Sequence, residues 1–235
     1  MIAGLQKMTL LDYPGKVACT VFFQGCNFRC PFCHNSGLLD KEPEQQIPSE
    51  ELLAFLKKRV GLLDGVCVTG GEPTLDPELP RLLREIKALG YAVKLDTNGS
   101  RPEVMKALAE QGLIDYVAMD IKNGPAFYGE TVGIPALQLT KVEESIRWLL
   151  AGNIPYEFRT TVAEPLHSEK SIQAMVYWLQ KLSGGKKAEK FFLQPFVDRD
   201  SVLCAGLSTP DAEKLRKMAV LLGSAAHSVQ IRGQD

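Results

Sequence analysis

The sequence lacks the features that mark membrane, exported and nucleic-acid-binding proteins. No apolar run reaches the roughly 18 residues that a membrane span needs, and the first seven residues lack the basic-then-apolar order of a signal peptide. Neither sign of charge is in excess, since 27 Lys and Arg face 28 Asp and Glu for a net charge of −1. Nothing therefore predicts nucleic acid or an anionic membrane as a partner. There is no internal repeat and no low-complexity tract, and we expect a cytoplasmic globular protein.

The length and the cysteine content fit a single domain. A chain of 235 residues can bury a large core without disulfide bonds. We predict one domain over residues 1–235, with a core at about 16–200 and a C-terminal helix and short strand at 208–231. The six cysteines do not predict a disulfide framework, because the cytoplasm keeps thiols reduced. Metal binding, catalysis and core packing are the remaining roles for them.

Short apolar runs rich in β-branched residues alternate with amphipathic stretches. The expected strands are Val17–Phe23, Gly65–Thr69, Ala92–Asp96, Asp115–Asp120, Tyr156–Val162, Lys190–Gln194 and Ser228–Ile231. The expected helices are Ser49–Val60, Glu78–Leu89, Pro102–Gln111, Lys141–Ala151, Lys170–Leu182 and Pro210–Gly223. Six β-then-α units in series predict an α/β fold with a parallel sheet, either open and doubly wound or barrel-like.

Several helix ends carry chemical signals. Thr140 and Glu143 have the spacing of a capping box, and Thr209 before Pro210 predicts a second N-cap. Glycines follow four of the apolar helical faces, as C-terminal glycines of helices do. They are Gly90, Gly112, Gly152 and Gly223.

Four unusual segments directly follow or close an expected strand. They are Cys26–Cys33, Gly70–Pro73, Asp96–Gly99 and Asp120–Lys122. In parallel α/β folds the ligands bind at the carboxyl ends of the strands. The position of these segments therefore predicts a ligand site at that end of the sheet.

Cys26, Cys30 and Cys33 lie within eight residues, and thiolates favour iron–sulfur clusters, zinc and Cu(I). Four other interpretations remain open. Residues 30–34 match the C-x-x-C-H pattern of a c-type haem site, and His34 could complete a Cys₃His zinc site. Cys30 and Cys33 could form a thioredoxin-like redox pair, or the three cysteines could have no role beyond packing in the protein core.

A [4Fe–4S] cluster normally takes four thiolates, and no fourth ligand is evident. Cys19 and Cys67 lie within apolar strands and are expected in the core, whereas Cys204 lies far along the chain in an ambiguous loop. One iron should therefore be open to a substrate, as in catalytic metal sites.

The Cys26-x₃-Cys30-x₂-Cys33 pattern, with the aromatic Phe32 before the last cysteine, resembles the signature of radical S-adenosylmethionine enzymes. The resemblance covers roughly residues 4–200. It implies a partial parallel (β/α)₆ barrel, a [4Fe–4S] cluster held by the three cysteines, and S-adenosylmethionine bound beside Phe32. Further motifs resemble those of the family in order. They are Gly70-Gly71-Glu72-Pro73 for the methionine amino group, Asp96-Thr97-Asn98-Gly99 and Asp120-Ile121-Lys122 for ribose, cation and carboxylate contacts, and Arg159 for the carboxylate.

Within that family the chain is similar to glycyl-radical-enzyme activases, above all to the anaerobic ribonucleoside-triphosphate reductase activating proteins. The segments that carry this likeness are Leu10–Lys16, Phe23–Cys30, Cys33–Asn35 and Leu193–Phe196. The resemblance implies reductive cleavage of S-adenosylmethionine to a 5′-deoxyadenosyl radical, which takes hydrogen from a glycine of a partner enzyme. It also implies a flavodoxin-like or ferredoxin-like electron donor.

The residue types agree with these implied roles. Lys122 and Arg159 suit a carboxylate, Asp96 or Asp120 suits a hydroxyl or a monovalent cation, and backbone without a Cβ at Gly70 lets a ligand approach closely. Each motif taken alone has a simpler explanation. The glycine and asparagine segments could be turns, and the charged residues could form structural ion pairs.

Two other functions remain open. The chain could be a radical S-adenosylmethionine enzyme that acts on a small molecule or RNA, such as a deazapurine synthase. It could also be a non-catalytic iron–sulfur or zinc binding module, which would not react with S-adenosylmethionine.

Overall fold

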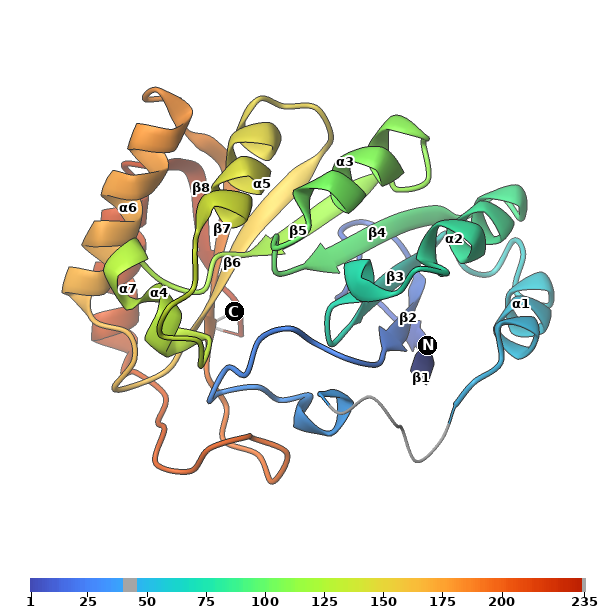
Figure 1. Cartoon of the computed structure of the whole chain (residues 1–235), viewed down its shortest axis with the longest axis horizontal. Helices are drawn as coiled ribbons and strands as arrows, with labels where there is room; N and C mark the ends of the chain where they lie inside the picture. The colour runs from blue at the N-terminus through green and yellow to red at the C-terminus, as the bar shows by residue number, and fades with distance from the viewer. Residues whose placement is uncertain (40–45, 234–235) are drawn as a thin grey trace. The chain divides into compact units, whose positions relative to one another are not determined.

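A computed structural model describes residues 1–39 and 46–233. Its strands are β1 (Ile2–Thr9), β2 (Ala18–Phe23), β3 (Gly65–Gly70), β4 (Ala92–Thr97), β5 (Tyr116–Asp120), β6 (Tyr156–Val162), β7 (Ala188–Pro195) and β8 (Ala226–Ile231). Its helices are α1 (Ser49–Lys57), α2 (Leu79–Ala88), α3 (Pro102–Glu110), α4 (Pro125–Thr131), α5 (Thr140–Leu150), α6 (Glu169–Ser183) and α7 (Ala212–Leu222), with short 3₁₀ turns at Ser36–Leu38 and Pro73–Leu75 (Figure 1).

The strands belong to one eight-stranded sheet, in which their order is their order along the chain. The pairs β2–β3, β3–β4, β6–β7 and β7–β8 are parallel, and β1 pairs with β2 in the antiparallel sense. The expected α/β class with a parallel-dominated sheet is therefore confirmed. The chain divides into two compact units, each described below by itself.

The first unit comprises the described residues within Met1–Asn27, Gly37–Thr97 and Glu103–Val117. Its strands β3 and β4 are buried on both faces, because the consecutive residues 66–68 and 93–95 are each at most 1% exposed, although one face of β4 carries the charged Lys94. This pattern is typical of parallel strands covered on both sides. The amphipathic α2 supplies part of that cover, since one of its faces is buried. The buried residues of that face are Leu79, Leu82, Leu83 and Ile86.

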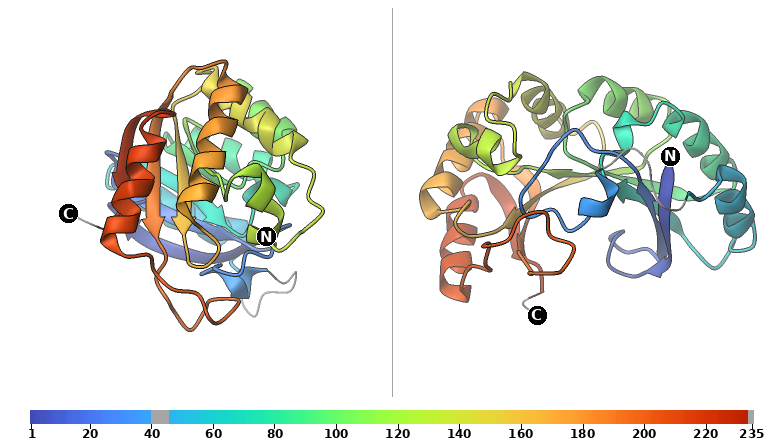
Figure 2. Two further views of the ribbon diagram at one scale, coloured as in Figure 1. Left: turned by 90° about the vertical axis from the view of Figure 1, so that its left-hand side faces the viewer. Right: turned by 60° about the horizontal axis from the view of Figure 1, so that its bottom comes forward.

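The second unit comprises the described residues within Phe28–Ser36, Asn98–Pro102 and Ala118–Asp235. Helices α6 and α7 pack against each other, and α7 also lies beside β8 (Figure 2). Phe158 on β6 stacks in a tilted geometry on Phe191 of β7, and both side chains are fully buried. The expected division of the chain into one domain over residues 1–235 stays a prediction.

Two elements were absent from the sequence-based expectation. Strand β1 was missed because its middle is polar and exposed at Gln6 and Lys7, so neither alternation nor a continuous apolar run marks it. It is an edge strand that pairs with β2, and its Ile2 also forms an isolated antiparallel bridge with Ile47. Helix α4 was missed because it has only seven residues and begins directly after Gly124 with Pro125.

The expected helix caps were partly wrong. Helix α5 begins at Thr140 itself after Leu139, so Thr140 and Glu143 form no capping box. Helix α7 is capped by Asp211, whose carboxylate accepts from Lys214 N, while the Thr209 hydroxyl bonds Phe196 O. A capping box does occur at Ser168 on α6. Gly90, Gly112 and Gly152 have positive φ as helix-ending glycines do, whereas Gly223 has φ −59°.

No helix within the described residues is long and apolar enough to cross a membrane.

Candidate active site

In the first unit the glycines after β3 bring that strand end against the start of the cysteine loop. A Cβ on Gly70 would lie 2.3 Å from Phe23 N, and one on Gly71 would lie 2.0 Å from Gly25 O. Gly71 N donates to Phe23 O at 2.8 Å, and Glu72 N donates to Gly25 O at 2.8 Å. The space left by each missing Cβ is thus filled by backbone just before Cys26. Contact of the Gly70 and Gly71 backbone with a ligand stays a prediction.

Glu72 is buried and points into the protein. Its Oε1 accepts from Thr74 N at 3.2 Å and from the hydroxyl of Thr97 at 2.8 Å. A buried carboxylate needs such donors to offset its lost hydration. The side chain therefore joins the carboxyl ends of β3 and β4, which is a structural role that the sequence did not predict.

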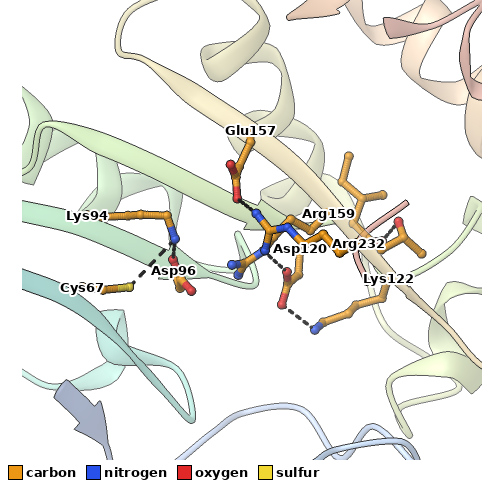
Figure 3. A network of polar contacts seen from close by, with 10 residues as sticks. Cys67, Lys94, Asp96, Asp120, Lys122, Glu157, Arg159 and Arg232 are labelled. Carbon is orange, nitrogen blue, oxygen red and sulfur yellow. Dashed lines mark hydrogen bonds and ion pairs between the residues drawn. The ribbon is translucent and has the colours of Figure 1, made fainter. Parts of the chain in front are cut away.

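Asp96, near the carboxyl end of β4, forms an ion pair with Lys94 two residues earlier (Figure 3). The pairing follows from the strand, because residues i and i+2 share one face. Lys94 is only 1% exposed, and its Nζ lies 3.9 Å from the sulfur of Cys67. Cys67 is the residue opposite Lys94 in the β3–β4 register. A lysine is almost never fully buried without a charged partner.

In the second unit the rest of the cysteine loop is held by several backbone bonds. Arg29 N donates to Val132 O at 2.9 Å, and Cys33 N donates to Cys30 O at 3.0 Å, which closes a tight turn between the two cysteines. Cys30 is buried and Cys33 is half-buried. The turn fixes the backbone from which these two thiols project.

The segment 196–204 lies along the same loop. His34 Nε2 bonds Val197 O at 2.7 Å and its ring stacks on Phe196, with centroids 5.5 Å apart. The Ser36 hydroxyl donates to Ser201 O at 2.6 Å, and Cys204 N donates to Pro31 O at 3.0 Å. His34 thus has a hydrogen-bonding role in the protein. The exposed Cys204 thus lies next to the cysteine loop.

Asp120, the last residue of β5, binds two cationic side chains (Figure 3). Its Oδ2 accepts from Lys122 Nζ at 2.9 Å, and its Oδ1 accepts from Arg159 Nε at 2.9 Å. Burial alone would raise the pKa of Asp120, but Arg159 and Lys122 hold it below its ordinary value. Burial likewise opposes the charge on Lys122, yet the Asp120 carboxylate and then the Cys30 thiolate raise its pKa. All three groups are therefore charged at neutral pH.

Phe32 connects the cysteine loop to this charged cluster. Lys122 Nζ lies 5.9 Å from the centroid of the Phe32 ring, within cation–π range. The ring also meets His167 edge-on at 5.9 Å. His167 Nε2 bonds Lys122 O at 2.7 Å, and burial lowers the pKa of its imidazole, so the ring is neutral at pH 7.

Asn98 begins the next stretch of the second unit. Its Oδ1 accepts from Ser100 N at 2.9 Å, so the side chain forms the turn that its residue type favours. Among the predicted site residues, the second unit thus contains Cys30, Phe32, Cys33, Asn98, Asp120, Lys122 and Arg159. The first unit contains Cys26, Gly70, Gly71, Glu72 and Asp96.

Sequence reasoning missed two residues of these clusters. Lys94 could have been found, because it is a charged residue between the apolar Val93 and Leu95 in the middle of an expected strand. His167 carried no such signal, since it lies in a loop and reaches Lys122 only through the fold.

The pattern of the radical SAM superfamily matches residues 20–176 of the chain. The chain belongs to this superfamily. This radical S-adenosylmethionine enzyme is 29% identical over 241 aligned residues to a protein of Methanocaldococcus jannaschii that is provisionally named as a glycyl-radical enzyme activating enzyme. The alignment covers 99% of this chain and 95% of that protein. It is also 34% identical over 131 residues to the pyruvate formate-lyase-activating enzyme of Clostridium pasteurianum, covering 52% of each.

A solved radical SAM methyltransferase from Sphaerobacter thermophilus has the same fold, with a TM-score of 0.73, 15% identity, and coverage of 96% of this chain and 68% of that one. The expected fold of radical SAM type and the expected enzyme class are thus confirmed. So is the likeness to glycyl-radical-enzyme activases.

Membership of the superfamily implies a [4Fe–4S] cluster and S-adenosylmethionine. The donor set fits a cluster, since none of the three loop cysteines forms a disulfide and thiolates are the ligands that such clusters take. Among the described residues, no group of three His, Cys, Asp or Glu side chains could hold a single metal ion.

Proposed function

We propose that Cys26, Cys30 and Cys33 bind a [4Fe–4S] cluster, and that the enzyme cleaves S-adenosylmethionine and activates a glycyl radical enzyme. Support for the ligand set comes from the spacing of the cysteines and from the tight Cys30–Cys33 turn. When bound, a cluster of this type supplies the electron that splits the sulfonium into methionine and a 5′-deoxyadenosyl radical. The radical then takes a hydrogen atom from a glycine, which leaves 5′-deoxyadenosine and a glycyl radical.

One observation carries the proposal: the Cys30–Cys33 turn and the Asp120 cluster meet through Phe32. Lys122 and Arg159 both donate to Asp120, and a guanidinium has further N–H groups for a ligand carboxylate. Two cations around one carboxylate leave an excess of positive charge, which suits the carboxylate of S-adenosylmethionine. We assign Arg159 and Lys122 to that group, and Phe32 to the shielding of the cluster from water.

We further propose that Asn98 binds the nucleoside part of S-adenosylmethionine, while Gly70, Gly71 and Glu72 form the strand end that receives its amino group. Asp96 and Asp120 set the charge around the ligand. The proposed partner is an anaerobic ribonucleoside-triphosphate reductase, with a flavodoxin-like or ferredoxin-like donor in the cytoplasm. The partner is supported by the resemblance of Leu10–Lys16 and Phe23–Cys30 to the activating proteins of those reductases.

Anaerobic reconstitution tests the first step. The protein is loaded with iron and sulfide, reduced with dithionite and supplied with S-adenosylmethionine, and we expect 5′-deoxyadenosine by chromatography. A reconstituted protein that forms none would overturn the proposed reaction.

A second measurement tests the partner. We expect a glycyl radical doublet in the electron paramagnetic resonance spectrum when an anaerobic ribonucleotide reductase is added. Cleavage without a radical on any glycyl radical enzyme would instead favour a small-molecule or RNA substrate.

A further inference from the structure

The two aspartates expected beside a monovalent cation each already bind a cation of the protein. In the first unit the ammonium of Lys94 pairs with Asp96. In the second unit Lys122 and Arg159 both pair with Asp120. The residues present therefore do not fit an additional metal cation at either carboxylate.

We propose that Lys94 is a built-in counter-cation of the S-adenosylmethionine site and takes the place of a bound sodium or potassium ion. Its ammonium matches potassium in charge and approximately in size, and it contacts the carboxylate that the metal would use. This inference rests on the proposed function, since Asp96 is assigned to the ligand site only there.

The burial of Lys94 separates this pair from an ordinary surface ion pair. Lys94 is 1% exposed and the Asp96 side chain 12%, whereas the Lys87–Asp115 pair of the same unit is 27% and 40% exposed. Water therefore screens the Lys94 charge weakly, and a second cation beside it would be repelled strongly. Burial of the charged Lys94 is unfavourable unless its ammonium remains paired with the Asp96 carboxylate. The ammonium therefore keeps occupying the position beside that carboxylate.

The surroundings of Lys94 also hold the ammonium in position. Lys94 lies in the middle of β4, opposite Cys67 of β3, and its Nζ contacts that sulfur at 3.9 Å. Because residues i and i+2 of a strand share one face, the backbone of β4 by itself brings Lys94 and Asp96 to the same side. Unlike a dissolved ion, this cation cannot leave when the salt is changed.

Asp120 gives an independent reason against a metal ion. Two cations contact its carboxylate, so the cluster of Asp120, Lys122 and Arg159 carries excess positive charge. Such a cluster attracts anions and repels a sodium or potassium ion.

The test compares potassium or sodium chloride with choline chloride at a constant ionic strength of about 0.2 M, so that screening is equal. For the unmodified protein we expect the thermal unfolding midpoint of the full-length chain and the rate of 5′-deoxyadenosine formation to be the same in all three salts. A rate that rises more than about threefold with potassium or sodium, or a midpoint that rises with either ion, would overturn the inference.

Variants sharpen the result. Lys94→Met should lower the unfolding midpoint by several degrees, since the carboxylate of Asp96 loses the buried ammonium of Lys94. It should also acquire a midpoint that rises with sodium or potassium. Lys94→Met combined with Asp96→Asn should lose that response, and Lys87→Met, in the exposed pair of the same unit, should never show it. A Lys94→Met protein whose unfolding midpoint changes with neither sodium nor potassium would contradict the inference.

The two proposals fail in different ways. Absence of 5′-deoxyadenosine in every salt contradicts the proposed function. The unfolding midpoint needs neither cluster nor substrate, so it still decides whether Lys94 replaces the metal ion.

Discussion

The two charged clusters use the same spacing in opposite order. In β4 the lysine precedes the aspartate, so Lys94 lies within the strand and is sealed by the sheet. After β5 the lysine follows the aspartate, so Lys122 lies beyond the strand end, and its side chain is 14% exposed. The order of two residues thus decides whether the cation is a fixed internal charge or a group that a ligand can reach.

The cysteines beside the two clusters differ in the same way. Cys67 is buried within a strand next to Lys94, whereas Cys30 lies on a loop where its thiolate raises the pKa of Lys122. Of these two cysteines, only Cys30 lies on the loop that also carries Cys26 and Cys33.

The largest expected effect comes from removing that ligand. Cys30→Ala should abolish cluster binding, with its absorbance near 400 nm, and should lower 5′-deoxyadenosine formation by more than about 10³-fold. Cys19→Ala is the matched control, because burial raises the pKa of Cys19 to about 12 and keeps it a thiol in the core. Anaerobic spectra and product analysis of both variants provide the measurement. A Cys30→Ala protein that still cleaves S-adenosylmethionine would refute the ligand set.

The next largest effect tests whether the cluster of Asp120, Lys122 and Arg159 receives the ligand. Arg159→Met or Lys122→Met should raise the KM for S-adenosylmethionine by about 10- to 100-fold, as expected for the loss of a charged hydrogen bond. Lys217→Met is the control, since Lys217 forms an exposed ion pair with Glu213 on α7 of the same unit. The KM and kcat of product formation are measured separately. An unchanged KM in both variants would assign Arg159 and Lys122 a structural role only.

The smallest effect concerns the pH dependence of stability. The folded-state pKa of Asp120 lies below its ordinary value near 3.9. Its carboxylate therefore stabilises the fold fully above about pH 4, and this contribution is lost as the pH falls through the folded-state pKa. Asp120→Asn should lower the free energy of unfolding by about 2 kcal/mol at pH 7, and this difference from the unmodified protein should shrink below about pH 4.

Urea unfolding at several pH values measures this difference. Glu213→Gln, which removes the exposed partner of Lys217, should cost less than about 1 kcal/mol at any pH. If Asp120→Asn lowered the free energy of unfolding equally at pH 7 and pH 3, Arg159 and Lys122 would not stabilise the charged form of Asp120.

The parallel strands could be predicted because their signal is local. Residues 66–68 form a continuous apolar run, and Val93 and Leu95 flank the single Lys94, which is typical of strands covered on both faces. The expected strand ends at Asp96 and Asp120 are confirmed, since both residues lie at or next to the last residue of a strand, whereas their place in a ligand site stays a prediction. The edge strand β1 has no such signal. The residues in its middle are exposed, so burial does not require them to be apolar.

Side-chain partners could not be predicted in the same way. Glu72 was assigned to a ligand motif, yet its carboxylate binds Thr97, 25 residues away. His167 meets Lys122 and Phe32 only because the loop after β6 returns to them. Such contacts depend on how strand ends are brought together, and sequence spacing alone does not report them.

The contacts of segment 196–204 with the cysteine loop set an order on biosynthesis. Cys30 and Cys33 leave the ribosome early, but Val197, Ser201 and Cys204, whose backbone groups hold their loop, follow more than 160 residues later. A nascent chain that stops short of Cys204 carries both thiols on a loop without these supports. The loop of Cys30 and Cys33 can therefore take up these contacts only after segment 196–204 has been synthesised.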